Sequence, residues 1–322
     1  MSQPYAIFSL NFLKAYWITM RPYLLFVSGV TGLAGLALAS ELHPIRGALI
    51  FLVFFFSYGF GQALTDCFQT DTDALSSPYR PLIQGLITKP QVLGVSLAGL
   101  LSSGLILVFC NPCTLLLSLL AVFGLATYTI FKRRWWAGPF YNAWIVALIP
   151  VIAALASGAF PLAAAREPPA RWVLLSVFFG YANFVLMGYY KDISADRATG
   201  YRTLPVVFGW QLTAGVSDLF ALLAFYFSGL LLQEKGVTSL QSWLSLCFWL
   251  AGVACTVAAQ WQIHRIRAEA LTHRPIANVV RGYILIHLGL GSALNPHFLF
   301  PGFIFYGLFE WALQARPEPK QV

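Results

Sequence analysis

The stretch TDCFQTDTDALSSPYRPLIQG, residues 65–85, is polar, yet it lies between two strongly apolar runs of the chain. It holds three aspartates and one arginine, in a chain of which only 10% of the residues are charged. On a helix, successive residues turn by about 100°, so positions three, four and seven apart share a face. One face of this stretch then carries Asp66, Gln69, Thr70 and Asp73, and Asp71 points away from it.

Two carboxylates and an amide oxygen on one face suit a hard cation such as magnesium, which binds a few carboxylates together with phosphate oxygens. Arg80 follows shortly afterwards and offers a planar fork for phosphate. The stretch therefore predicts a magnesium site at Asp66, Gln69 and Asp73, with Arg80 on a phosphate group. The alternative is a solvated loop whose aspartates cap helix N-termini.

A second polar stretch, YYKDISADRATGYRTLPVVFG at residues 189–209, also follows an apolar run. Asp192 and Asp196 are four residues apart and are expected to share one helical face. Lys191 and Arg202 add positive charge nearby. Each stretch has an acidic pair followed by an arginine with Pro and Leu close by. Two such facing patches predict a magnesium-bridged diphosphate site.

At these residues the chain resembles the UbiA superfamily of intramembrane prenyltransferases. The first family motif, Asn-Asp-x-x-Asp-x-x-x-Asp followed by Pro-x-Arg-Pro, is matched by Asp66, Asp73 and residues 78–81. The second, Asp-x-x-x-Asp followed by Gly-x-Arg-Thr-Leu, is matched within residues 192–204. The resemblance runs from about residue 17 to about residue 294.

Two positions depart from the first motif: Thr65 stands where the family has Asn, and Gln69 stands where it has the middle Asp. Both side chains still carry oxygen, but one negative charge is lost. The departures leave open a UbiA-like terpene cyclase, in which the double bonds of the ionised substrate capture the cation themselves. A transporter or a non-catalytic membrane scaffold is a third class, and it predicts no turnover of diphosphate.

The resemblance implies an all-α, polytopic membrane helical bundle around a central cavity. It also implies magnesium-dependent transfer of a polyprenyl group from a prenyl diphosphate to an aromatic or lipid-like acceptor. The expected catalytic and metal-binding residues are Asp66, Asp73, Asp192 and Asp196, with Gln69 as a further metal ligand. The residues expected to bind diphosphate are Arg80, Lys132, Lys191, Arg202 and Asn142.

Composition agrees with this class, because a chain of 322 residues with 58% apolar residues and a mean hydropathy of +0.71 is typical of a polytopic membrane protein. Nine spans are predicted, at roughly 22–40, 47–64, 91–110, 112–131, 141–163, 172–190, 209–232, 243–262 and 279–296. The expected parts are an interfacial segment (1–21), the transmembrane domain (22–296) and an extra C-terminal segment (297–322). The apolar run 299–314 in the last part is either a tenth span or a helix lying at the interface.

Positive charge is distributed asymmetrically over the predicted loops. Of 20 Lys and Arg residues, only Arg46, Arg166, Arg171 and Lys235 fall on one side of the spans when a tenth span is counted. By the positive-inside rule the other side, which holds both aspartate stretches, is cytoplasmic. This asymmetry accounts for most of the net charge of +8, so nucleic-acid binding is not expected.

Aromatic side chains can stabilise an allyl cation in a cavity that excludes water. Six of them lie near the inner ends of spans that are expected to line the cavity. These are Tyr58, Phe60, Tyr128, Tyr141, Tyr181 and Tyr189.

Overall fold

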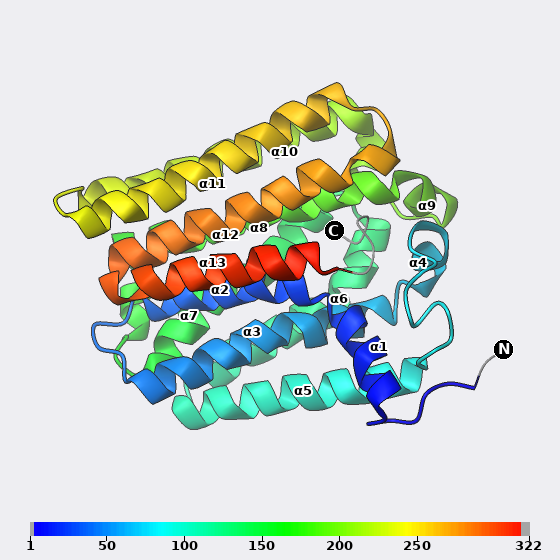
Figure 1. Cartoon of the computed structure of the whole chain (residues 1–322), viewed down its shortest axis with the longest axis horizontal. Coiled ribbons are helices and arrows are strands. Elements are labelled where there is room, and N and C mark those ends of the chain that lie inside the picture. The colour runs from blue at the N-terminus through cyan, green and yellow to red at the C-terminus, as the bar shows by residue number, and fades with distance from the viewer. Residues whose placement is uncertain (1–2, 317–322) are drawn as a thin grey trace.

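The computed structural model describes residues 3–316, which form helices, turns and loops with no β-strand among them (Figure 1). The all-α bundle expected from the sequence is confirmed. The α-helices are α1 (Leu10–Met20), α2 (Leu25–Leu36), α3 (Pro44–Asp66), α4 (Thr70–Ser76), α5 (Lys89–Cys110), α6 (Thr114–Arg134), α7 (Gly138–Ser157), α8 (Pro168–Tyr189), α9 (Ile193–Ala198), α10 (Leu204–Lys235), α11 (Leu240–Arg265), α12 (His273–Leu294) and α13 (Leu299–Gln314). Short 3-10 turns are η1 (Pro22–Leu24), η2 (Leu162–Arg166), η3 (Tyr190–Asp192), η4 (Glu269–Leu271) and η5 (Pro296–Phe298).

The long helices lie side by side, and the short helices α4 and α9 sit together at one end of the bundle (Figure 1). Helices α3, α6, α8 and α11 end there, and α5, α7, α10 and α12 begin there. We call this the polar end. It holds both aspartate stretches, whereas Arg46, Arg166, Arg171 and Lys235 lie towards the opposite ends of their helices.

Among the described residues, eight helices are long and apolar enough to cross a membrane: α3, α5, α6, α7, the run Pro168–Ala198, α10, α11 and α12. They match eight of the nine predicted spans. The first predicted span, 22–40, is a shorter apolar helix at Pro22–Leu36. The chain leaves the helix in a series of turns after Leu36, so this prediction was too long at its C-terminal end.

Local sequence sets the points at which the long helices begin. Proline occupies the first turn of α3, α5, α7, α8 and α10, where its missing N–H has no intrahelical partner to lose. The α5 start also has a capping box, in which the Thr88 hydroxyl accepts from the Gln91 N–H and the Gln91 Oε1 accepts from the Thr88 N–H at 2.8 Å. Of these starts, those of α5, α7 and α10 lie at the polar end, and those of α3 and α8 lie at the opposite end.

Helices α11 and α12 approach each other closely at Gly252 and Gly282. A Cβ added at Gly252 would lie 2.7 Å from the backbone nitrogen of Ile286 and 2.8 Å from the carbonyl oxygen of Gly282. Small residues that allow such close backbone approach are typical of helix pairs in membranes. The α11–α12 contact thus depends on the absence of a side chain at residue 252.

The C-terminal helix α13 runs along the bundle beside α12 and α2, rather than across its end (Figure 1). Phe305 and Phe309 are buried and contact the ring of Phe26 with centroids 4.9 and 5.8 Å apart. Arg281 on α12 pairs with Glu310 on α13 at 2.7 Å. At 16 residues, or about 24 Å, α13 is short for a membrane span. Its direction along the bundle favours a tenth span over a helix lying at the interface. The tenth span stays a prediction.

The first prediction concerns the α11–α12 crossing. Gly252→Ala should lower the melting temperature in detergent, because the new methyl meets backbone atoms that cannot rotate away; overpacking of this kind costs about 1–3 kcal/mol. Gly94→Ala on α5 is the control, since a Cβ there meets nothing within 4 Å. Equal melting temperatures for the two variants would show that the crossing is looser than described.

Candidate active site

The first aspartate stretch is broken into two helices. Helix α3 ends at Asp66, the chain turns through Cys67 and Gln69, and α4 begins at Thr70. The single helical face expected over residues 66–73 is therefore wrong. Asp66, Gln69 and Asp73 nevertheless line the same cavity, whereas Thr70 does not. The turn redirects the chain so that side chains from two helices reach one place.

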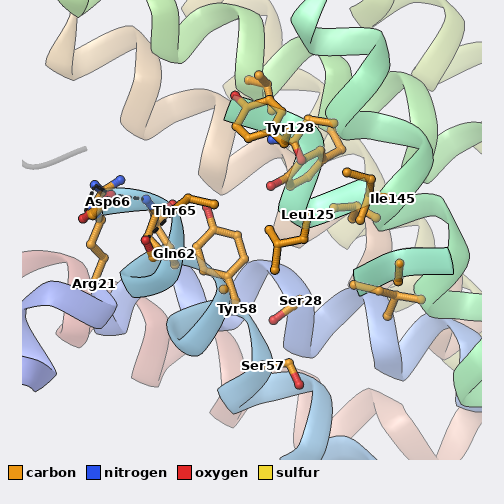
Figure 2. Close-up of a pocket in the computed structure, with 18 of the residues that line it drawn as sticks. Arg21, Ser28, Ser57, Tyr58, Gln62, Thr65, Asp66, Leu125, Tyr128 and Ile145 are labelled. Carbon is orange, nitrogen blue, oxygen red and sulfur yellow. Dashed lines mark hydrogen bonds and ion pairs between the residues drawn. The ribbon is translucent and has the colours of Figure 1, made fainter. Parts of the chain in front are cut away.

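Arg21 and Arg80 hold two of the three carboxylates of this stretch, those of Asp66 and Asp73. Arg21 Nη2 donates to both oxygens of Asp66, at 2.9 and 3.0 Å, and Gln62 Nε2 donates to Asp66 Oδ1 at 2.7 Å (Figure 2). Arg80 Nη1 pairs with Asp73 and lies 3.5 Å from Asp66 Oδ1. Asp66, Asp73 and Arg80 are buried. The cluster thus joins Arg21, between α1 and η1, to side chains of α3, α4 and the loop after α4.

The cluster balances burial against charge. Burial raises the pKa of the Asp73 carboxyl above its ordinary value, and the Arg80 guanidinium opposes this rise. Burial by itself would lower the pKa of Arg80, but Asp66 and Asp73 hold it above the ordinary value. Each ion is therefore tolerated in this place because its partner is present.

The second aspartate stretch divides its two carboxylates between different surroundings. Lys191 and Asp192, in η3, line the cavity beside the first stretch. Asp196, in α9, is fully buried and does not line the cavity. Asp196 Oδ2 accepts from the Thr203 hydroxyl at 3.1 Å, while Oδ1 has no hydrogen-bond partner. The expected shared face of Asp192 and Asp196 is therefore wrong, because the chain passes from a 3-10 turn into α9 between them.

Lys132, near the end of α6, connects the two stretches. Its Nζ donates to Gln69 Oε1 at 2.9 Å and lies 3.9 Å from Asp196 Oδ1. It also lies over the rings of Tyr189 and Tyr201, 5.3 and 5.2 Å from their centroids. A single buried cation thus faces oxygen atoms from both stretches.

Two charged residues of the stretches face outward. Asp71 pairs with Arg133 Nη2 at 2.6 Å, and both side chains are about two-fifths exposed. Arg202 is exposed and does not line the cavity, although its backbone N–H donates to the Arg133 carbonyl at 3.0 Å. The prediction that Arg202 binds diphosphate finds no support in this cavity. Asn142, by contrast, lines it.

The cavity has a volume of about 300 Å³ and changes character along its length. Its polar part is formed by the charged residues above, and Tyr58, Tyr128, Tyr181 and Tyr189 follow. Phe60 and Tyr141, which were also expected to line it, do not. Beyond the tyrosines the wall is largely apolar, with Leu125 and Ile145 among its side chains (Figure 2). Such a shape suits an amphipathic molecule with one strongly anionic end.

The residues present suit a hard cation by their chemistry. Carboxylates of Asp66, Asp73 and Asp192 and the amide oxygen of Gln69 lie at one end of the cavity, and Asp196 Oδ1 is a buried oxygen without a hydrogen bond. Within residues 3–316, however, no three acidic, Cys or His side chains are grouped closely enough to hold a metal ion. Arginines and Lys132 occupy the positions next to these oxygens instead.

Arg21 is the residue of this site that the sequence analysis missed. An Arg-Pro pair at the start of an apolar run is typical of an interfacial anchor, and it was counted only as positive charge. In the structure Arg21 has a left-handed backbone, with φ of 54°, which is uncommon for a residue other than glycine. This conformation turns the chain from α1 into η1 and brings the guanidinium to Asp66.

Comparisons with known proteins identify the family and the fold. Residues 28–278 match the model of the UbiA prenyltransferase family. Digeranylgeranylglyceryl phosphate synthase of Thermococcus kodakarensis is 30% identical over 217 residues, covering 65% of this chain and 74% of the relative. Chlorophyll synthase of Arabidopsis thaliana is 28% identical over 166 residues, covering 48% and 41%. A UbiA homolog from Aeropyrum pernix K1 shares the fold, with a TM-score of 0.70, 16% identity and coverage of 83% and 96%.

The second prediction follows from the ion-pair cluster. Arg80→Gln should lower the melting temperature in detergent strongly, because Asp73 is left buried without its partner, a loss of about 3–5 kcal/mol. Adding Asp73→Asn to Arg80→Gln should restore much of the loss by removing the unpaired charge.

Arg133→Gln is the matched control for this experiment. It breaks the exposed pair with Asp71, which is expected to contribute no more than about 1 kcal/mol. If Arg80→Gln melts at the same temperature as Arg133→Gln, the buried cluster does not stabilise the fold.

Proposed function

The chain belongs to the UbiA prenyltransferase family, and on that premise we propose that it transfers a polyprenyl group from a prenyl diphosphate to an acceptor within the membrane. The observation that carries this proposal is the two-part cavity. Its charged end and its apolar continuation match the two parts of a prenyl diphosphate. The diphosphate is expected at the polar end and the isoprenoid tail among the apolar side chains.

Four cations are available to the diphosphate. Arg21, Arg80, Lys132 and Lys191 all line the polar part of the cavity. Guanidinium groups pair with phosphate oxygens through two parallel hydrogen bonds, and an ammonium group adds a compact point charge. Arg21 and Arg80 are in contact with carboxylates in this structure, and they can exchange those contacts for phosphate oxygens when the donor binds.

The carboxylates are proposed to act through magnesium. Asp66, Asp73, Asp192 and Asp196, with Gln69, would hold the ion. When bound, magnesium supplies positive charge that stabilises the departing diphosphate. Asp196 does not line the cavity in this structure, and Lys132 Nζ lies 3.9 Å from its Oδ1, so Lys132 is expected to shift when Asp196 binds the ion.

The reaction requires the bond between the allylic carbon and the diphosphate oxygen to break, with the electron pair leaving on that oxygen. The allyl cation is then captured by the acceptor, which loses a proton. Tyr58, Tyr128 and Tyr189 line the cavity next to the cations, and the electron-rich faces of such rings stabilise positive charge. The apolar wall beyond them excludes the water that would otherwise capture the cation.

A lipid-like acceptor is the best-supported class. Several relatives are named as digeranylgeranylglyceryl phosphate synthases, and a further one as a chlorophyll synthase. These names describe long apolar products, in keeping with a cavity inside a membrane bundle. The asymmetry of positive charge supports a cytoplasmic location for the polar end.

The third prediction tests the function directly. Purified protein given geranyl, farnesyl or geranylgeranyl diphosphate with a mixture of membrane lipids and aromatic acids should form prenylated products, detected by mass spectrometry. Chelation with EDTA should abolish product formation, and excess magnesium should restore it. Turnover that persists undiminished in EDTA would contradict the magnesium site. A hydrocarbon or alcohol product formed equally well without acceptor would identify a cyclase instead.

The fourth prediction compares the buried aspartates, Asp73 and Asp196, with the exposed Asp71. Asp73→Ala and Asp196→Ala should each remove nearly all turnover, and the double variant should be little worse, because groups that act as a unit are strongly non-additive. Asp71→Ala should keep substantial activity, since Asp71 faces outward and pairs with Arg133.

Melting temperatures of the same four proteins separate function from folding. Asp196→Ala is the decisive variant, because Asp73→Ala also leaves Arg80 buried without its main partner and should melt at a lower temperature in either case. A purely structural role would make Asp196→Ala lose thermal stability along with activity. An inactive but fully stable Asp71→Ala protein would contradict the assignment of inner and outer carboxylates.

A further inference from the structure

We call the part of the cavity beyond the tyrosines the apolar limb. It is closed at the end furthest from the charged residues. Phe54 on α3, Leu107 on α5 and Ile152 on α7 line it there and are 4%, 5% and 3% exposed. They belong to one packed cluster of buried side chains. A chain that enters from the polar end therefore cannot continue straight towards the opposite end of the bundle.

The limb has a limited depth. Lys132 and Ser118 mark the polar and apolar ends of the cavity on α6, and they are fourteen residues apart. Fourteen residues of α-helix span about 21 Å. A donor tail longer than this must bend or leave the cavity through a side wall.

The side wall between α5 and α6 is the thin one. Val122 on α6 lines the cavity and is also 51% exposed on the outside of the bundle. Helix α5 packs mainly on α3, and α6 packs mainly on α7, so the two helices make few contacts with each other. The wall here is largely one side chain thick.

The inner side of the wall between α5 and α6 is lined by small residues. Ser103 and Gly104 on α5 and Ser118 and Ala121 on α6 are all small, and all four line the cavity. A Cβ added at Gly104 would meet nothing within 4 Å, so a side chain there would project into empty space. Gly104 is therefore not required for helix packing, in contrast to Gly252.

We propose that Gly104 determines the length of prenyl chain that the protein accepts, because it keeps open a lateral gap between α5 and α6 through which long tails pass into the bilayer. This inference rests on the proposed function, since it assumes a prenyl diphosphate in the cavity. Short donors fit within the limb, whose floor is closed. Longer donors turn at Phe54 and Leu107 and leave past Gly104 and Val122.

The fifth prediction measures binding, so that it does not depend on knowing the acceptor. Non-reacting thiolodiphosphate analogues with geranyl, geranylgeranyl and octaprenyl tails are titrated, with magnesium present, into the full-length protein in lipid nanodiscs. In Gly104→Trp the indole fills the gap, and the octaprenyl analogue should bind at least ~10-fold more weakly than to the wild type. The geranyl analogue should lose several-fold less than that.

Leu105→Trp is the matched control. Leu105 is the next residue on α5, is 59% exposed and does not line the cavity, so its variant should bind all three analogues as the wild type does. Val122→Trp narrows the gap from α6 and should reproduce the selective loss even if Gly104→Trp fails to fold.

The outcomes distinguish the two proposals. If the wild type binds none of the analogues, the proposed function fails and this inference fails with it. If the wild type binds them but Gly104→Trp and Val122→Trp weaken all three equally, or leave the octaprenyl analogue unaffected, the gap does not select chain length. An equal loss in Leu105→Trp would likewise overturn the assignment of Gly104.

Discussion

Charge neutralisation at buried carboxylates is the constraint on which the polar end depends. In a low-dielectric bundle an unpaired carboxylate loses the stabilisation of water, and the remedy is a cation within contact distance. Arg80 supplies it to Asp73 and lies near Asp66, which Arg21 also holds. Because these residues come from the junction of α1 and η1, from α3, from α4 and from the following loop, the pairing fixes how four separate parts of the chain meet.

Because these charges compensate one another, the site can rearrange when charged ligands bind. A diphosphate would bring negative charge that competes for the arginines, and a divalent cation would replace them at the carboxylates. The diphosphate alone or the divalent cation alone would leave the charges of the cluster unbalanced, whereas the two together would balance them. Lys132 has a similar double position, since it faces Gln69 from the first stretch and Asp196 from the second. The proposed reaction thus uses groups that already compensate one another in the structure.

Sequence reasoning reached the fold because membrane spans are long and uniform in character, and it reached Asp66, Asp73 and Asp192 because polar residues between such spans are conspicuous. It failed where local geometry decides. The break at residues 67–69 is a turn without Gly or Pro, so periodicity could not reveal it. The burial of Asp196 and the exposure of Arg202 depend on how α9 packs. The spacing of these residues along the sequence does not reveal that packing. Arg21 was missed because its partner, Asp66, is 45 residues away.

The position of α13 bears on how the protein is made. Phe305 and Phe309 pack against Phe26, and Tyr283 shares a hydrogen bond with Thr31 across 252 residues of sequence. At about 5–20 residues per second of synthesis, α2 waits many seconds for these partners. The Phe26 ring lacks its contacts with Phe305 and Phe309 until α13 has been synthesised. This seam therefore closes only after α13 has been synthesised, and truncation before residue 299 leaves the α2 side of it exposed.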